Sequence, residues 1–235
     1  MKSLVQHIKE EFNFRINRDS AKNVYSYSPK TTVELKHIIQ DHYDNNIYNL
    51  NDIDTSRIED FSALFLNDPN TGNPQFDVSK WDVSSGEDFS WMFSNCYKFN
   101  CDLYNWNVSN GKSFSYMFCN CKEFNSDLSD WNVSNSEDFK SMFDGCKNFN
   151  SDLSKWDVSN CEDFGSMFDE CNKFNSDLSQ WNVSKGMYFN SMFCTCKNFN
   201  ADLSNWNVNN GIKFVSMFDD CPIKQEFKPK HTDIK

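Results

Sequence analysis

Tryptophan recurs every 25 residues along most of this chain. The residues that keep this spacing are Trp81, Trp106, Trp131, Trp156, Trp181 and Trp206. Most other apolar residues of the stretch recur in step with them, so every 25-residue unit repeats one pattern. A fixed period of this size predicts a solenoid, in which each repeat packs against its neighbours and presents an extended surface.

One repeat, starting at Trp131, indicates a short strand, a short helix and a loop. Trp131 and Val133 have the two-residue spacing of a strand face. Four apolar residues follow at the spacing of one helical face: Phe139, Met142, Phe143 and Cys146. We predict an α/β solenoid, a leucine-rich-repeat-like right-handed coil with one strand and one helix per repeat, whose apolar columns all point inward.

The chain divides into three regions. Residues 1–49 are predicted to form a helical N-terminal cap, residues 50–224 a solenoid of about seven repeats, and residues 225–235 a disordered tail. The first repeat is degenerate and has a three-residue insertion around Pro69, and Pro222 truncates the last.

Two helices are predicted in the cap. The first covers about a dozen N-terminal residues, with Leu4, Ile8 and Phe12 on one face. The second starts at a Thr31–Glu34 capping box. Its apolar face is formed by Val33, Leu35, Ile38 and Ile39. Covering the first repeat is the expected role of this segment, and a separate docking module is the alternative.

Cysteine follows the repeat rather than an independent pattern. Six of the ten cysteines form another 25-residue column: Cys96, Cys121, Cys146, Cys171, Cys196 and Cys221. Free cysteine packs like a small hydrophobic residue, which favours reduced core thiols. Disulfides between neighbouring repeats are the alternative.

Charge and hydropathy limit the classes of partner. The formal net charge is −11, which repels phosphate backbones and argues against nucleic acid. No apolar run approaches the ~20 residues of a membrane span, so no membrane insertion is expected. Residues 1–11 lack the apolar core of a signal peptide, and the sequence as written predicts a cytoplasmic protein.

Polar columns run beside the apolar ones. Two of them contain the residues Asn100, Asn125, Asn150, Asn175 and Asn200, and Asp102, Asp127, Asp152, Asp177 and Asp202. An aspartate ladder suggests cation sites, but one carboxylate per repeat is far fewer than the oxygens that Ca²⁺ requires. The favoured interpretation is that these side chains cap turns by bonding to backbone N–H groups.

Residue types that commonly act in catalysis do not form a recognisable motif in this sequence. All four histidines lie outside the regular repeats, and the pairs Cys119–Cys121 and Cys194–Cys196 stand three repeats apart. A two-cysteine zinc site needs further ligands that the sequence does not offer. We therefore expect no enzyme activity, no cofactor and no metal.

Differences between repeats mark the candidate binding surface, because the shared residues build the rod. Aromatic residues interrupt the pattern in the first two regular repeats: Trp91, Tyr97, Tyr104 and Tyr116. Apolar residues interrupt it in the last two: Met187, Tyr188, Ile212 and Val215. Such residues are typical of protein interfaces. The alternatives are packing against the cap and ordinary exposure of single apolar residues.

The string from Met117 to Asn135 resembles the repeat of BspA-like leucine-rich-repeat proteins. That repeat also occurs in Mycoplasma lipoproteins and bacterial surface proteins of unknown function. The lead-in from Pro29 to Leu35 and the segment from Leu50 to Ser56 resemble the start of such arrays. The resemblance implies a leucine-rich-repeat-like fold, a role in adhesion or partner recognition, and a cell-surface or secreted location as the alternative to the cytoplasm.

Three functions follow as hypotheses. The first is a non-catalytic scaffold that binds a protein partner. The second is a structural protein that self-associates through the ends of its rod. The third, an enzyme, would require a bound metal or a pocket that gathers the cap histidines.

Overall fold

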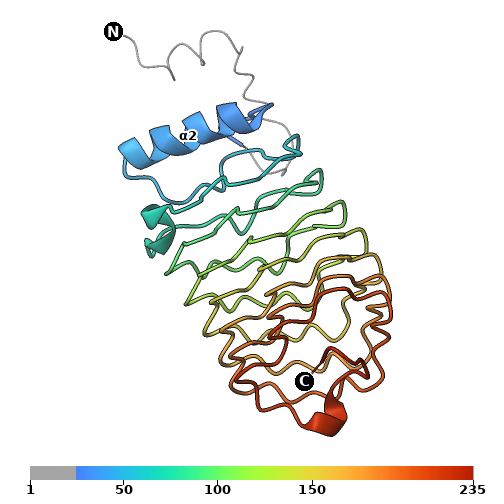
Figure 1. The fold of residues 1–235 in the computed structure, drawn as a ribbon. Helices are drawn as coiled ribbons and strands as arrows, with labels where there is room; N and C mark the ends of the chain where they lie inside the picture. Colours follow the sequence, from blue (N-terminus) through green and yellow to red (C-terminus); the bar gives the residue numbers. More distant parts are fainter. Residues whose placement is uncertain (1–24, 235) are drawn as a thin grey trace.

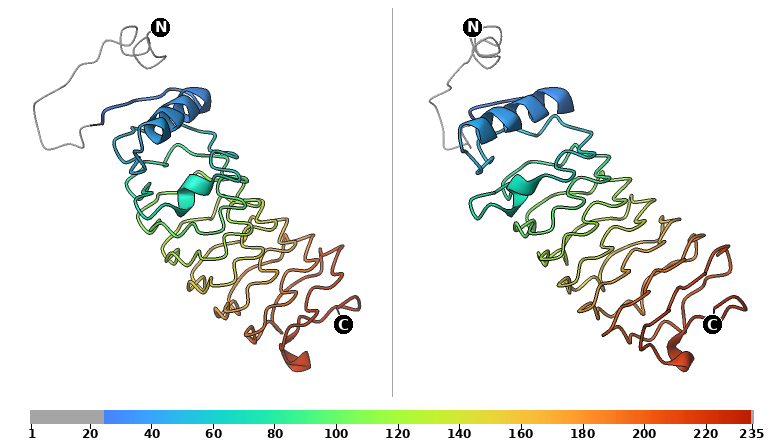
Figure 2. Two further views of the ribbon diagram at one scale, coloured as in Figure 1. Left: turned by 90° about the vertical axis from the view of Figure 1, so that its left-hand side faces the viewer. Right: turned by 60° about the vertical axis from the view of Figure 1, so that its left-hand side comes forward.

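The computed structural model describes residues 25–234, so the helix predicted at the N-terminus lies outside the described residues. One α-helix, α2 (Thr32–Asp44), precedes a stack of coils. Two short 3-10 helices, η1 (Pro69–Gly72) and η2 (Gln225–Phe227), lie in the insertion loop and after the last coil. Successive coils lie one on another along the axis of the molecule, with α2 across the first of them (Figures 1 and 2).

The prediction of a strand and a helix in every repeat is wrong. Within residues 25–234 the repeats contain no α-helix and no extended strand. The segment 139–146, predicted as a helix, is a series of tight turns. Ser141 has φ 51° and Gly145 has φ 74°, values of the left-handed region that a right-handed α-helix excludes. The molecule is therefore not an α/β solenoid of the leucine-rich-repeat type.

Backbone hydrogen bonds explain why the turns replace a helix. The Ser141 N–H donates to the Gly165 carbonyl at 2.8 Å, and the Phe143 N–H donates to the Met167 carbonyl at 3.0 Å. Both acceptors belong to the next coil. The Met142 N–H instead closes a turn onto Phe139 at 3.1 Å. Alternate N–H groups thus join neighbouring coils, and few remain for an α-helix.

The left-handed positions recur in two columns. They comprise Trp91, Tyr116, Ser141, Ser166, Ser191 and Ser216, and Asn95, Asn120, Gly145, Glu170, Thr195 and Asp220. Single parallel bridges run beside them and connect Asp60, Asp88, Ser113, Asp138, Asp163, Tyr188 and Lys213. The bridges lie seven residues after each tryptophan, and not in the Trp-x-Val segment where the sequence predicted a strand.

The inward columns are confirmed by burial. Phe143 is fully buried, and its ring lies 5.7 Å from that of Phe118 and 5.8 Å from that of Phe168, centroid to centroid. Each repeat tryptophan also has a polar partner; the Trp131 indole N–H donates to the Leu103 carbonyl at 3.0 Å. All ten cysteines are free, and the Cys146 thiol donates to the Phe118 carbonyl at 3.0 Å.

The N-terminal end of the stack is covered by α2. The predicted N-cap is present, because the Thr31 hydroxyl accepts the Glu34 N–H at 3.2 Å. The reciprocal bond of a capping box is displaced, since the Glu34 carboxylate accepts the N–H of Lys30 at 2.7 Å. Leu35, Ile38 and Ile39 are buried against the first coil. Val33 differs from its prediction, since it points away from the core and is 64% exposed. No helix within residues 25–234 is long and apolar enough to span a bilayer.

The C-terminal end is covered by residues 222–234, which the sequence predicted in part as a disordered tail. The Leu203 N–H donates to the Phe227 carbonyl at 2.8 Å. In earlier coils a serine hydroxyl of the next coil accepts this bond, as Ser151 does from Leu128. Ile223 and Ile234 are buried. The tail thus supplies one acceptor, the Phe227 carbonyl, and some of the apolar groups that a further coil would provide.

Candidate functional site

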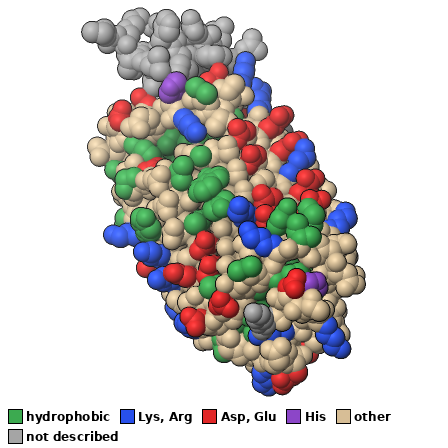
Figure 3. Space-filling view, viewed as in Figure 1, with side chains coloured by type: hydrophobic (Ala, Val, Ile, Leu, Met, Phe, Trp, Pro, Cys, Tyr) green, Lys and Arg blue, Asp and Glu red, His purple; other side chains and the backbone are tan. Residues whose placement is uncertain are grey.

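The turn segments of successive coils form one side of the stack. We call this side the turn face; in the coil of Trp131 it comprises residues 137–145. Most of the sequence differences between repeats lie here. Hydrophobic, acidic and basic side chains alternate in patches over the surface in Figure 3. The turn face carries six of the eight residues that the sequence indicates as a candidate binding surface, namely Trp91, Tyr116, Met187, Tyr188, Ile212 and Val215.

Trp91 and Tyr116 form a stacked pair on the turn face. Their ring centroids are 3.9 Å apart and the ring planes differ by 9°. Both residues have left-handed backbones, with φ 61° and 57°, at a position where the later coils carry serine. A bulky residue is uncommon in this region of φ. Trp91 nevertheless remains 39% exposed, so the pair presents a fixed aromatic surface to solvent.

The degenerate first coil adds a third position to this left-handed column and an exposed apolar residue near it in the sequence. Ala63 precedes Trp91 in the left-handed column, and its N–H donates to the Ser90 carbonyl of the next coil at 2.9 Å. Leu66, three residues later, is 38% exposed. Leu66 was not predicted as a site residue, although its alignment with Ser94 in the next repeat could have indicated an apolar replacement.

Tyr97 and Tyr104 do not join the stacked pair. Tyr97 lies beneath the Lys122 ammonium, 4.9 Å from ring centroid to Nζ. The Tyr104 hydroxyl donates to an Asp130 carboxylate oxygen at 2.6 Å, and this hydrogen bond raises the pKa of Tyr104. The first predicted cluster is therefore split, with only Trp91 and Tyr116 in contact.

The second predicted cluster lies together on the last two coils. The Ile212 N–H donates to the Met187 carbonyl at 2.8 Å, and Tyr188 forms a parallel bridge with Lys213. Ile212 and Val215 are 67% and 69% exposed. These residues form an apolar patch at the C-terminal end of the turn face.

Two groups of the turn face, the Asp144 carboxyl and the Cys119 thiol, have raised pKa values. Burial, with the charges of Asp169 and Glu170 beside it, raises the pKa of Asp144 to about 7. Burial also raises the pKa of Cys119 to about 12. A thiol shifted in this direction is a poor nucleophile at neutral pH.

The polar ladders make turn contacts, as the favoured interpretation predicted. The Asp127 carboxylate accepts the Ser129 N–H at 2.9 Å. The Asn125 side-chain oxygen accepts the Asn150 N–H of the next coil at 2.7 Å. In the part of the chain that the structure describes, no three His, Cys, Asp or Glu side chains are grouped so as to hold a metal ion.

The buried histidine of the cap also makes structural contacts. His42 is 2% exposed, and its ring nitrogens lie 2.8 Å from the Ile38 carbonyl and 3.0 Å from an Asp52 carboxylate oxygen. This ring links α2 to the first coil. It is thereby placed to hold the cap on the stack.

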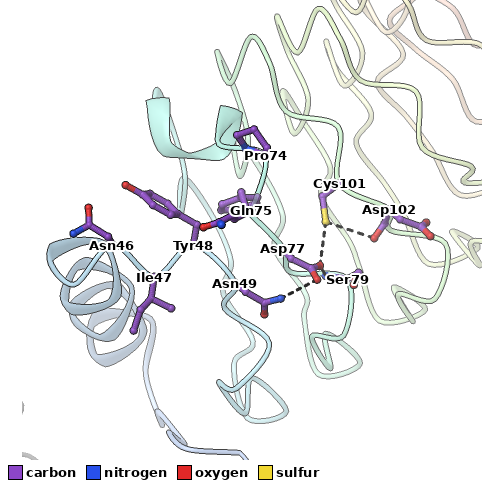
Figure 4. A pocket seen from close by; sticks show the side chains of 11 residues that line it. Asn46, Ile47, Tyr48, Asn49, Pro74, Gln75, Asp77, Ser79, Cys101 and Asp102 are labelled. Atoms are coloured by element: carbon purple, nitrogen blue, oxygen red, sulfur yellow. Dashed lines mark hydrogen bonds between the residues drawn. The ribbon is translucent and has the colours of Figure 1, made fainter.

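A groove that the sequence analysis missed lies beside the cap (Figure 4). We call it the cap groove. Its volume is about 760 Å³, and it lies between the loop after α2, the segment after η1 and the aspartate ladder. Its lining includes Ile47, Tyr48, Asn49, Pro74, Asp77 and Asp102. The three-residue insertion before Trp81 was the one feature of the sequence that could have indicated it.

The repeats match a known family of uncharacterised proteins. Residues 33–151 and 131–230 each match the family described as "Mycoplasma protein of unknown function, DUF285". The two matches together cover most of the chain, which therefore belongs to this family. No curated protein and no solved structure matches the chain significantly.

Proposed function

We propose that this member of the Mycoplasma family is a non-catalytic scaffold that binds a protein partner through its turn face. The observation that carries the proposal is the stacked Trp91–Tyr116 pair, which is exposed and held at 3.9 Å on a turn backbone. Large aromatic residues dominate binding energy in protein interfaces. Their few side-chain torsions also keep the entropy cost of binding low.

The surroundings of the pair support a protein partner rather than a small molecule. The pair lies in the left-handed column that also contains Ala63, and its exposed stacked rings span two successive coils. Lys140 lies 5.8 Å from the Tyr116 ring, and Lys112 forms an ion pair with Glu87 at 2.6 Å. An apolar centre with a charged, hydrated rim is the usual organisation of a protein interface.

The proposal extends to the finer family and to a biological role. The repeat string from Met117 to Asn135 resembles that of the BspA-like repeat proteins, and this resemblance implies a role in adhesion. We propose partner recognition of that kind. The cytoplasm and the cell surface remain the two alternative locations, and the identity of the partner decides between them.

Replacing the pair by the residue of later coils tests the proposal. In the double variant Trp91→Ser/Tyr116→Ser, each new residue matches Ser141 and Ser166 of the same column. Immobilised protein is used to capture partners from the native source, followed by quantitative mass spectrometry. We expect the specifically retained protein to be lost.

The matched control changes the same column where it carries serine. Ser166→Ala/Ser191→Ala alters two residues at the same turn position without touching the pair. The control should retain the partner as well as the unmodified protein does. If the aromatic double variant retained the partner equally well, the pair would not be part of the binding site.

A structural role through the stack ends is the second candidate. Four N–H groups of the last coil have no partner among residues 25–234: those of Phe214, Ser216, Phe218 and Asp220. A row of unpaired donors can pair with another chain. At the other end α2 covers the first coil, where the Thr32 hydroxyl donates to the Asp60 carbonyl at 2.5 Å. Light scattering that shows a concentration-dependent increase in mass would favour this candidate over the scaffold.

A further inference from the structure

The cap groove combines apolar walls with carboxylates at one end of the aspartate ladder. Ile47, which is 46% exposed, and Tyr48 belong to the loop after α2, and Pro74 follows η1. Asp77 and Asp102 are the first two members of the ladder (Figure 4). Later coils have the ladder but neither of these two loops, so the walls are specific to this end.

Asp77 is held as a fixed anion. One carboxylate oxygen accepts the Ser79 N–H at 2.9 Å, and the other accepts the Asn49 side-chain amide at 3.2 Å. Burial opposes ionisation of Asp77, but hydrogen bonding, chiefly from Ser79, outweighs it and lowers the pKa of Asp77. The Cys101 thiol lies 3.7 Å from the same carboxylate. The negative charge therefore persists at neutral pH.

No cation of the described chain neutralises this charge. None of the Lys or Arg side chains in residues 25–234 forms an ion pair with Asp77 or Asp102. The neighbouring donors are all neutral: backbone N–H groups, an amide and a thiol. Carboxylates that line a hollow with apolar walls focus their field into it and attract positive charge.

The walls select among cations. Arginine and lysine bury their methylene stems on apolar surface and keep the charged group at a polar site. Ile47 and Pro74 offer such a surface next to Asp77, and the ring of Tyr48 can also interact with a cation through its face. A hydrated inorganic cation would gain no stabilisation from contact with these apolar walls.

We propose that the cap groove binds an arginine or lysine side chain of a basic segment in a partner protein. The charged end pairs with Asp77 and Asp102, and the stem packs on Ile47, Tyr48 and Pro74. This site is separate from the turn face, and it does not depend on the Trp91–Tyr116 pair. A partner with a basic segment also complements the net charge of −11 on this chain.

A labelled peptide tests the groove directly. The probe is a fluorescein-labelled Gly-Leu-Arg-Leu-Gly peptide, and its binding to the full chain is measured by fluorescence anisotropy at low ionic strength. The double variant Asp77→Asn/Asp102→Asn should weaken binding by about tenfold or more, since two charge contacts are lost. The fold should persist, because Asn107 makes the same turn contact to Ser109 that these aspartates make to Ser79 and Tyr104.

The ladder itself supplies the matched control. Asp127→Asn/Asp152→Asn removes the same charge from the same turns, but in coils without the groove walls. It should change the affinity by less than about twofold, because exposed charges at a distance are screened. Ile47→Ser, which retains both carboxylates, should weaken binding by the loss of stem packing.

Three results would overturn the proposal. One is equal binding of the peptide with citrulline, which is neutral, in place of arginine. Another is equal weakening by the two aspartate double variants, which would indicate general attraction to an acidic protein. The third is tight binding of free spermidine without binding of the peptide, which would assign the groove to a small polyamine. The Trp91→Ser/Tyr116→Ser variant should bind the probe normally, so failure here is distinct from failure of the turn-face proposal.

Discussion

The central coils, residues 131–180, and the N-terminal part of the stack, residues 49–116, share one core but differ in surface. Aromatic rings stack from coil to coil in both: Phe89 and Phe114 lie 5.1 Å apart, and Phe143 and Phe168 lie 5.8 Å apart. At the turn face the central coils carry Ser141 and Ser166 where the N-terminal coils carry Trp91 and Tyr116. The residues that repeat build the stack, and those that depart from the repeat make the candidate sites.

The cap groove combines a residue of the repeat with loops that depart from it. Asp77 and Asp152 occupy equivalent ladder positions and accept equivalent backbone N–H groups, from Ser79 and Ser154 at 2.9 Å. Asp77, unlike Asp152, is flanked by the loops after α2 and η1 and lines the cap groove. A shared structural residue can thus gain a second role where the regular pattern ends.

Truncation of a central core ring should give the largest effect. Phe143→Ala leaves a cavity among Phe118, Phe149 and Phe168, whose rings lie within 5.8 Å of it. We expect a loss of about 3–5 kcal/mol in the free energy of unfolding. Urea denaturation checks this value, and a loss below about 1 kcal/mol would show that the shared columns do not carry the stability.

The Asp144 carboxyl should make stability depend on pH. Its pKa is about 7 in the folded chain against an ordinary 3.8, so the folded state binds the proton more tightly than the unfolded state. The stabilisation that protonated Asp144 gives the folded state is present below about pH 4 and is lost as the pH rises toward 7. Asp144→Asn should flatten this decline and be the more stable protein at pH 8. Thermal unfolding at pH 4 to 8 checks the sign, and a variant less stable at pH 8 would contradict it.

Removal of the cap contact should have a smaller effect, restricted to the N-terminal end. Thr31→Ala deletes the oxygen that accepts the Glu34 N–H, which should cost about 1 kcal/mol. Hydrogen exchange should show faster opening of α2 than of the central coils. Uniform acceleration along the whole stack would instead indicate that the cap and the coils unfold as one unit.

The aromatic pair should matter least for stability. Trp91→Ser/Tyr116→Ser removes one stacked contact at the surface, which is worth about 0.5–1.5 kcal/mol, and places a small residue in the left-handed turns. We expect a net change below about 1 kcal/mol by the same urea titration. A loss as large as that of Phe143→Ala would make the pair part of the core.

Much of the core could be predicted from the sequence, and its backbone could not. The 25-residue period identified the buried columns because each buried position requires an apolar residue in every repeat. Spacing such as that of Phe139, Met142 and Phe143 fits both a helix and a series of turns, since apolar periodicity does not record where N–H groups donate. The serine and asparagine columns at the left-handed positions were a usable indication of turns, because small polar residues tolerate that conformation.

The candidate sites were predicted less completely. Trp91 and Tyr116 were identified because they interrupt a column, and the same comparison could not tell that Tyr97 and Tyr104 lie apart from them. The cap groove depends on how two loops fold around Asp77. Loop conformation follows from local turns and contacts rather than from the repeat, so the 25-residue period could not predict the groove.

A regularised chain tests the central claim most directly. The variant Trp91→Ser/Tyr116→Ser/Met187→Glu/Ile212→Glu gives each position a residue found in the same column of other coils. Thermal unfolding and quantitative partner capture are measured on the same preparation. The account predicts a midpoint within about 4 °C of the unmodified protein, with loss of the retained partner. Full retention of the partner by this stable, regularised chain would contradict the claim that departures from the repeat form the binding surface.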